Sequence, residues 1–233
     1  MRSLLVLWDI DYTLIDSGGV GEHLYGLAFK EMFGRDLPGI ATLAGRTDRA
    51  IIADTLALAG VKDPAGHVDA FLAQLAAQAP LVRELAMRRC TALPGALAAV
   101  KALAATSQEL WIAQSVLTGN TRALAEVKLA ALGFTSFFDL AVGAYGDHHE
   151  VRAELVHLAR QLAASAYGRG FPGQATVLIG DTPLDVAAAL ATGARVVAVA
   201  TGGSSAAELA TAGAHAVLGD LSETAAVLAA IVG

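Results

Sequence analysis

Short apolar runs alternate with helical stretches along most of the chain. The first run, at residues 3–8, shows no alternation of apolar and polar positions, as expected for a parallel strand covered on both faces. Similar runs predict five more strands, at residues 110–117, 138–142, 176–179, 195–200 and 216–218. The segments between them have helical periodicity, at residues 94–105, 121–132, 151–164 and 183–191. Such alternation is typical of βαβ units, so the pattern predicts an α/β fold with a doubly wound parallel sheet.

One long segment interrupts this alternation. Between residues 17 and 89 no strand is evident, and helical patterns dominate at residues 21–33, 48–58 and 68–87. More than seventy residues are too many for a simple crossover connection between two strands. We therefore predict a helical cap domain at residues 17–89, inserted into an α/β core formed by residues 1–16 and 90–233.

The composition is that of a globular protein and excludes several classes. Hydrophobic residues make up 55% of the 233 residues and charged residues 16%, which excludes a disordered chain. No apolar run reaches the roughly 18 residues of a membrane span, and no secretory signal is evident. The net charge is −6 without basic clusters, so we expect no nucleic-acid partner and no membrane partner. The single cysteine, Cys90, excludes an intramolecular disulfide, and we expect a cytoplasmic monomer or homodimer.

Acidic and hydroxyl side chains follow the predicted strands at their carboxyl ends. In a doubly wound sheet these ends share one edge, which is where ligands bind. The side chains concerned are Asp9, Asp11, Thr13, Thr118, Asn120, Asp181, Thr182 and Asp185. Four carboxylates packed together repel one another unless a cation neutralises them, and oxygen donors favour Mg²⁺ over Zn²⁺. We therefore expect the four aspartates to gather around one divalent ion.

The first two aspartates have positions that suit different chemical roles. Asp9 ends the buried strand and is the more restrained, which suits a nucleophile that must attack in line with a leaving oxygen. Asp11 lies further out, where it could give a proton to a departing alkoxide and then take one from water. A carboxylate nucleophile in phosphoryl transfer would form a labile aspartyl phosphate.

These segments resemble motifs of a known family. Residues 9–14, Thr118 and residues 180–185 look like motifs one, two and four of the haloacid dehalogenase (HAD) superfamily. The helical insertion after the first motif resembles the small helical cap of the phosphoglycolate-phosphatase-like branch. Residues 93–95 are similar to the segment in which the chain of that branch passes from the cap back into the core. The resemblance implies a Rossmann-like core with a helical cap and a Mg²⁺-dependent phosphatase that acts on small phosphorylated metabolites, with phosphoglycolate as the first candidate substrate.

The resemblance also implies a role for each matching residue. Asp9 would be the phosphorylated nucleophile, and Asp11 the general acid and base, whose main-chain carbonyl also binds Mg²⁺. Asp181 would be the remaining carboxylate ligand of Mg²⁺, so the metal site comprises Asp9, Asp11 and Asp181. Asp185 would act on metal-bound water or orient the cation of the third motif.

Hydroxyl and amide groups would bind the phosphoryl group beside these carboxylates. Thr118 would hydrogen-bond the phosphoryl oxygens, with Gly119 and Asn120 supplying donors next to it. Thr182 also stands at a strand end, where it could either contact substrate or cap the following helix. In the insertion, Arg46 and Thr47 could contact substrate, or Thr47 could cap the next helix, and the sequence favours neither.

The third motif departs from the usual Lys-Pro pair of the superfamily. No lysine occurs at residues 143–152, and Arg152 opens a predicted helix at about the right place. Its guanidinium could pair with both a phosphate oxygen and Asp9, so we predict that Arg152 supplies the positive charge. Lys128 is the rival, but it lies in the helix after the second motif, and we expect it to point away from the site.

Two other functions remain compatible with the same residues. A phosphomutase of the β-phosphoglucomutase type would share every catalytic residue. The missing Lys-Pro pair also leaves open a catalytically idle phosphate-binding module.

Overall fold

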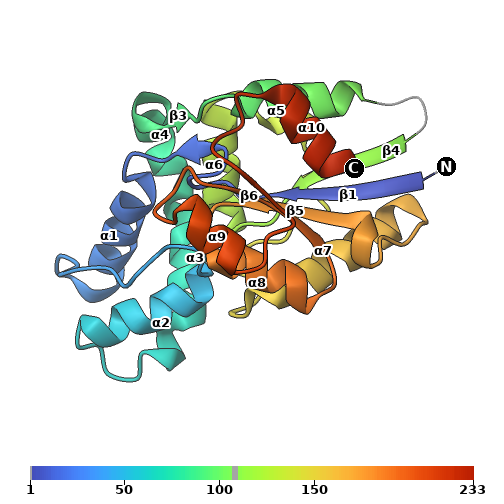
Figure 1. The fold of residues 1–233 in the computed structure, drawn as a ribbon. Coiled ribbons are helices and arrows are strands. Elements are labelled where there is room, and N and C mark those ends of the chain that lie inside the picture. The colour runs from blue at the N-terminus through green and yellow to red at the C-terminus, as the bar shows by residue number, and fades with distance from the viewer. Residues whose placement is uncertain (1, 107–109) are drawn as a thin grey trace.

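Five parallel strands form the central sheet of the computed structural model, which describes residues 2–106 and 110–233 (Figure 1). In sheet order they are β4 (Leu110–Val116), β1 (Arg2–Trp8), β5 (Thr176–Gly180), β6 (Arg195–Val199) and β7 (Ala216–Leu218). The first strand of the chain lies between β4 and β5 and pairs in parallel with both. The predicted α/β fold with a doubly wound parallel sheet is thus confirmed.

Helices cover both faces of the sheet, so β1 is buried on both sides. Leu4, Val6 and Trp8 pack into one apolar cluster, and Leu5 and Leu7 into a second cluster on the opposite face. This two-sided burial explains why the strand shows no alternation of apolar and polar residues. The first cluster includes α5 (Ala96–Ala105), α6 (Arg122–Ala131) and α10 (Thr224–Val232), and the second α7 (Arg152–Tyr167), α8 (Pro183–Ala191) and α9 (Ala206–Thr211).

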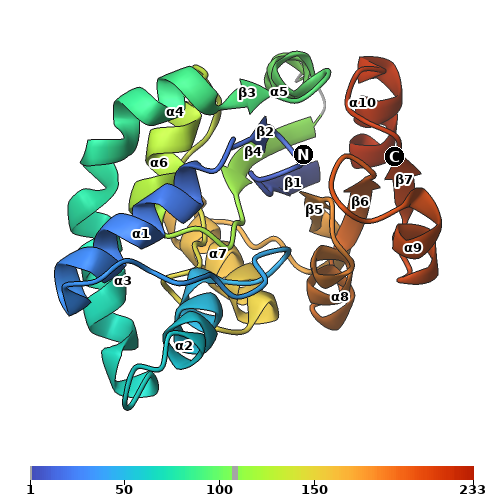
Figure 2. The same cartoon turned by 90° about the vertical axis from the view of Figure 1, so that its left-hand side faces the viewer.

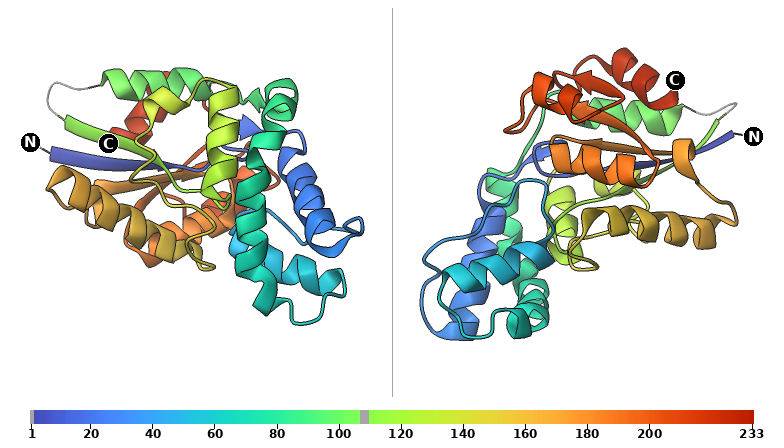
Figure 3. Two further views of the ribbon diagram at one scale, coloured as in Figure 1. Left: turned by 180° about the vertical axis from the view of Figure 1, so that it is seen from behind. Right: turned by 60° about the horizontal axis from the view of Figure 1, so that its bottom comes forward.

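A helical unit lies beside the carboxyl ends of the strands (Figures 1 and 2). Its helices are α1 (Val20–Phe33), α2 (Asp48–Leu58), α3 (Val68–Gln78) and α4 (Arg83–Arg89), with short 3₁₀ turns at Ala65–His67 and Ala79–Val82. Two antiparallel segments, β2 (Ile15–Asp16) and β3 (Thr91–Ala92), join it to the core. Figure 3 shows the unit from two further directions at the same end of the sheet.

The interior of the helical unit is aromatic and continuous with the core. Tyr25 and Phe29 of α1 are buried, and the ring of Tyr25 lies 5.5 Å from that of Phe71 in α3. These side chains belong to the same apolar cluster as Trp8 of β1. Burial of about 150–250 Å² per aromatic ring makes such contacts a main source of packing energy. The unit is therefore packed firmly against the strand ends.

The strand predicted at residues 138–142 is wrong. This segment follows the edge of β4, where the main-chain contacts are isolated: Asp139 N–H donates to the Gln114 carbonyl, Ala144 N–H donates to the Val116 carbonyl, and the Ala144 carbonyl accepts from Thr118 N–H. Between them the Asp139 side chain accepts from the N–H of Ala141, and the N–H of Val142 donates to the Asp139 carbonyl. Because an aspartate stabilises a local turn in this way, the chain turns instead of extending along the strand.

The helix predicted over residues 68–87 is divided in the structure. Pro80 lies in the 3₁₀ turn Ala79–Val82, which separates α3 from α4. Proline lacks the N–H that an uninterrupted helix requires, so the break occurs at this residue. The short helices α9 and α10 and the two-residue strands β2 and β3 were not predicted. No helix in the described part of the chain is long and apolar enough to span a membrane.

Candidate active site

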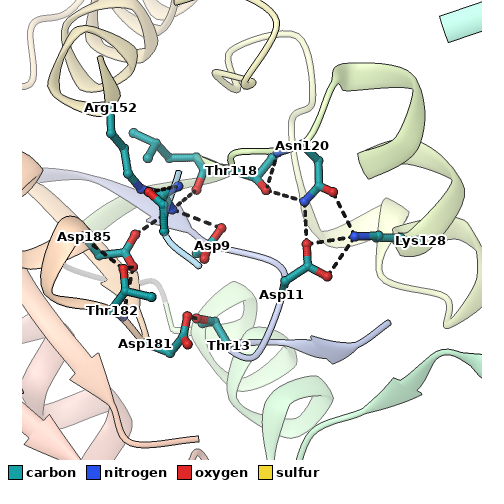
Figure 4. A network of polar contacts seen from close by, with 12 residues as sticks. Asp9, Asp11, Thr13, Thr118, Asn120, Lys128, Arg152, Asp181, Thr182 and Asp185 are labelled. Atoms are coloured by element: carbon teal, nitrogen blue, oxygen red, sulfur yellow. Dashed lines mark hydrogen bonds and ion pairs between the residues drawn. The ribbon is translucent and has the colours of Figure 1, made fainter. Parts of the chain in front are cut away.

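Three buried carboxylates lie together at the end of the sheet that faces the helical unit (Figure 4). Asp9 directly follows β1, and its main-chain N–H donates to the carbonyl of Ile179 in β5 at 2.8 Å. Asp181 directly follows β5, and Asp185 lies in the first turn of α8. One oxygen from each of these three aspartates lies within 4.8 Å of the other two. Two neighbouring strands and the helix after the second strand therefore build the cluster.

Burial and mutual repulsion change the acidity of this cluster. Burial raises the pKa of Asp9 and Asp181 above the usual aspartate value, and neighbouring carboxylates raise it further, while Arg152 opposes the change. One guanidinium is a single positive charge against three carboxylates. A divalent cation would lower these pKa values, and hard cations such as Mg²⁺ bind carboxylate oxygens. The residues present therefore fit a metal ion of this kind.

Arg152 lies where the sequence leads us to expect the third-motif cation. It is the first residue of α7, and its side chain is buried. The Nη2 atom lies 3.1 Å from Asp9 Oδ1 and 2.6 Å from Asp185 Oδ1. The Nε–H group is buried without a partner in the described structure. Arg152 thus joins two of the clustered aspartates. Its Nε–H remains available to donate a hydrogen bond to a ligand oxygen.

The prediction that Lys128 points away from the site is wrong. Its Nζ atom lies 2.8 Å from both carboxylate oxygens of Asp11 and 2.8 Å from Asn120 Oδ1. Helix side chains point back toward the N-terminus of their helix, so a long side chain in the second turn of α6 reaches the strand end before it. Leu124, four residues earlier on the same face, lines the same cavity, so this face of α6 turns toward the site.

The Asp11 carboxylate does not join the other three aspartates, contrary to the expected gathering of four. It faces Lys128 and also accepts hydrogen bonds from Ser17 and Asn120. Burial acts to raise the pKa of Asp11, but Lys128 and these hydrogen bonds outweigh it and hold the pKa below the usual value. Of the three residues predicted to bind the metal, Asp9 and Asp181 therefore lie together, while the Asp11 carboxylate has a separate partner.

The segment after β4 connects the core to the helical unit. Thr118 is buried, and its hydroxyl oxygen accepts from Nδ2 of Asn120 at 2.8 Å. The carbonyl of Gly119 accepts from the N–H of Asp48 at 2.7 Å. A Cβ atom on Gly119 would lie only 1.9 Å from the carbonyl oxygen of Arg46, so only glycine allows this close approach. All three predicted residues of this segment therefore lie at the junction.

The predicted substrate contacts in the insertion have local partners. Thr47 is the N-cap of α2, where its hydroxyl accepts from Ala50 N–H and donates to the carbonyl of Glu150. Arg46 pairs with Asp54 at 2.6 Å. In the core, Thr182 caps α8 in a reciprocal capping box with Asp185. The capping alternatives for Thr47 and Thr182 therefore describe what these side chains do in the structure.

A cavity of about 660 Å³ lies between the helical unit and the strand ends. Most of the predicted site residues line it: Asp9, Asp11, Arg46, Thr118, Gly119, Asn120, Arg152, Asp181 and Thr182. Thr47 and Asp185 lie outside its lining. A cavity of this size, with apolar walls and a few convergent polar groups, has the character of a small-molecule site.

Sequence reasoning missed a buried polar pair in the cavity wall. The hydroxyl of Tyr25 donates to Asp48 Oδ1 at 2.7 Å, and the N–H of Thr121 donates to Asp48 Oδ2 at 2.6 Å. Burial raises the pKa of Asp48 to about 6. An aspartate in the first turn of a helix is common, so the sequence offered no sign of this partner from α1.

Comparison with protein families identifies the family of the chain. The model of the haloacid dehalogenase-like hydrolases matches residues 6–190 of the chain. No curated protein sequence matches the chain.

Solved structures resemble the chain over nearly its whole length. A predicted phosphatase from Clostridium acetobutylicum is 16% identical with a TM-score of 0.67, covering 98% of this chain and 100% of that one. A structure from Bacteroides vulgatus that carries the name β-phosphoglucomutase is 18% identical with a TM-score of 0.66, covering 99% and 89%. A predicted phosphoglycolate phosphatase from Haemophilus somnus is 18% identical with a TM-score of 0.63, covering 97% of each chain. At these identities the likeness establishes the fold.

Proposed function

Because the chain belongs to the haloacid dehalogenase-like hydrolase family, we propose that it is a Mg²⁺-dependent phosphatase of small phosphate monoesters that forms an aspartyl phosphate on Asp9. One observation carries this proposal. Asp9 is fixed at the end of β1, pairs with Arg152 and shares a buried cluster with Asp181 and Asp185 at the wall of a cavity. A nucleophile, a cation and a metal-binding group are thus brought together where a substrate can reach them.

Mg²⁺ would be held by the side chains of Asp9 and Asp181, and by the main-chain carbonyl of Asp11 that the family resemblance implies. Asp185 lies close by, but its two oxygens already accept from Arg152 and from Thr182. When bound, the ion supplies positive charge that offsets the charge of the phosphoryl oxygens and of the attacking carboxylate.

The side chains of this protein would divide the remaining work. Asp9, restrained by its main-chain hydrogen bond to β5, attacks phosphorus and displaces the leaving oxygen. Arg152 neutralises charge on Asp9 and offers its free Nε–H to a phosphoryl oxygen. The Thr118 hydroxyl follows the neighbouring strand β4, lines the same cavity and is a further donor.

Asp11 would handle protons beside the reacting group. It lines the same cavity, and its lowered pKa keeps it ionised, as acceptance of a proton from the water that cleaves the aspartyl phosphate requires. The resemblance also assigns to it the protonation of the leaving oxygen. Because p-nitrophenolate leaves without a proton, p-nitrophenyl phosphate tests the Asp9 step separately from this second role.

Hydrolysis of p-nitrophenyl phosphate with Mg²⁺ tests the proposal. EDTA should stop turnover and added Mg²⁺ should restore it, and Asp9→Asn should lower kcat at least about 1,000-fold with an unchanged circular dichroism spectrum. Asp36→Asn, the same change at an exposed aspartate, is the matched control and should leave kcat unaltered. Undiminished turnover by Asp9→Asn would exclude the covalent route.

Two other outcomes would redirect the assignment. Bisphosphate-dependent isomerisation of a sugar phosphate without release of inorganic phosphate would indicate a phosphomutase. Phosphate-ester binding without turnover in the presence of Mg²⁺ would indicate an idle binding module.

A further inference from the structure

The cavity is larger than the phosphoryl group and the Asp9 cluster require. Its volume of about 660 Å³ lies within the range of sites that hold drug-sized ligands, and a phosphoryl group occupies a small part of it. Away from the cluster the wall is largely apolar, with the side chains of Tyr12, Leu43, Ile51 and Leu124. The remaining space is where the leaving group of a phosphate ester would lie.

The positively charged side chains of the cavity wall all have partners within the protein. Among the described residues that line the cavity these are Arg46, Lys128 and Arg152. The three N–H donors of Lys128 match its three acceptors, the two Asp11 oxygens and Asn120 Oδ1. Arg152 pairs with Asp9 and Asp185, so its charge serves the phosphoryl end of the site.

Arg46 is likewise held by partners within the protein. Its Nη2 atom lies 2.6 Å from Asp54 Oδ2 and 3.2 Å from the carbonyl oxygen of Ala50. Its Nη1 atom donates to the carbonyl of Thr42 at 3.3 Å. Arg89, the guanidinium behind the glycines at the cavity edge, donates to the Gly18 carbonyl and is not part of the lining. A second anionic group on a substrate would therefore meet no free cation in this wall.

The same space contains negative charge without a cationic partner. Glu22 lines the cavity from α1, is exposed to solvent and forms no ion pair in the described structure. The half-exposed ring of Tyr12 lines the same space. The backbone of Tyr12 has φ of 55°, a left-handed conformation that is unusual for a residue with a bulky side chain. The leaving-group space is thus apolar, aromatic and negatively charged.

We propose that the enzyme accepts phosphate monoesters whose leaving group carries no negative charge, and that Glu22, with no free cation in the described lining to offset it, excludes leaving groups with a second anion. This specificity rests on the proposed phosphatase function. It favours neutral or amine-bearing alcohols with an apolar face, and it disfavours phosphoglycolate, whose carboxylate would face Glu22 without a cation to bind it.

Three two-carbon esters that differ in terminal charge test this specificity: ethyl phosphate, O-phosphoethanolamine and phosphoglycolate. The value of kcat/KM for phosphoglycolate should be at least about tenfold below that for ethyl phosphate, because two like charges a few ångströms apart near a protein surface change a rate constant by about this factor. O-Phosphoethanolamine should equal or exceed ethyl phosphate. Phenyl phosphate and 4-carboxyphenyl phosphate repeat the comparison with easier leaving groups, so slow alkyl turnover does not leave the result undecided.

A charge-neutral variant assigns the effect to its residue. Glu22→Gln should reduce the discrimination between phenyl and 4-carboxyphenyl phosphate about three- to tenfold. Glu31→Gln, the same change at an exposed position of the same helix outside the cavity, should leave the ratio unaltered. A ratio that Glu22→Gln leaves unchanged would refute the role of Glu22.

The outcomes separate this inference from the function on which it rests. If the charged and uncharged esters are cleaved equally well, or phosphoglycolate is preferred, the specificity is refuted while the phosphatase assignment stands. If neither p-nitrophenyl phosphate nor any of these esters is cleaved, the phosphatase assignment fails and the specificity with it.

Discussion

The buried contact between Lys128 and Asp11 allows a sharp test of the site's electrostatics. The Lys128 side chain is 3% exposed, and its Nζ atom makes three contacts of 2.8 Å, two with Asp11 and one with Asn120. Lys128→Met keeps most of the side-chain volume but removes the charge and all three donors. The Asp11 carboxylate would then remain without its main positive partner.

The structure sets the size of the expected effect. Removing one member of a buried ion pair costs about 3–5 kcal/mol of unfolding free energy. The Asp11 side chain is 31% exposed, so water can replace part of the lost interaction, and we expect a smaller loss of about 2–3 kcal/mol. For a protein of this length that corresponds to a decrease in Tm of about 5–10 °C.

Urea denaturation monitored by circular dichroism measures this loss of unfolding free energy. Hydrolysis of p-nitrophenyl phosphate reports on the site. Glu126→Gln is the control on the same helix, because it breaks the exposed Arg122–Glu126 pair, which is worth about 0.3–0.5 kcal/mol. The double variant with Asp11→Asn should lose less than the sum of the single variants, because the unpaired charge is then absent. The reasoning is refuted if Lys128→Met costs no more than Glu126→Gln, or if the two site changes are additive.

Three further predictions concern other parts of the site. Arg152→Ala should lower kcat for p-nitrophenyl phosphate at least about 100-fold. Arg152→Lys should recover only part of this activity, because a lysine cannot bridge Asp9 and Asp185 in the same way. Full activity of Arg152→Ala would contradict this prediction. The pKa of Asp48 is raised from 3.8 to about 6, so the folded state binds its proton more tightly than the unfolded state. The unfolding free energy of the wild type relative to Asp48→Asn should therefore fall by up to about 3 kcal/mol as the pH rises from 4 to 7, and a constant difference in denaturation experiments across this range would oppose it. Gly119→Ala should lower the unfolding free energy by about 1–3 kcal/mol because its Cβ would overlap the Arg46 carbonyl, whereas Gly203→Ala, where nothing lies within 4 Å, should be nearly neutral by the same assay.

The fold was largely predictable because its signals are local. Apolar runs without alternation correspond to strands buried on both faces, and five of the six predicted strands occur in the sheet. The segment at residues 138–142 has the same apolar character, but the Asp139 side chain stabilises a turn that hydropathy does not reveal. Pro80 was visible in the sequence, and its effect on the helix predicted at residues 68–87 follows from its missing N–H.

The site was predictable only as far as strand ends determine it. Asp9, Asp181 and Asp185 converge because parallel strands and the following helix begin and end at one edge of the sheet. The direction of Lys128 depends on which face of α6 meets the core, and the partnership of Tyr25 with Asp48 depends on how α1 packs against α2. Both are tertiary contacts between distant segments, so no local pattern specifies them.

The central claim is that Asp9 becomes phosphorylated during turnover. Acid quench during turnover of a phosphate ester in the presence of Mg²⁺, followed by borohydride reduction and peptide mass spectrometry, converts an aspartyl phosphate to homoserine at its position. We predict substrate-dependent conversion at Asp9 and none at Asp11 or Asp181. Full phosphatase turnover with no conversion at Asp9, or with conversion at another aspartate, would contradict the account.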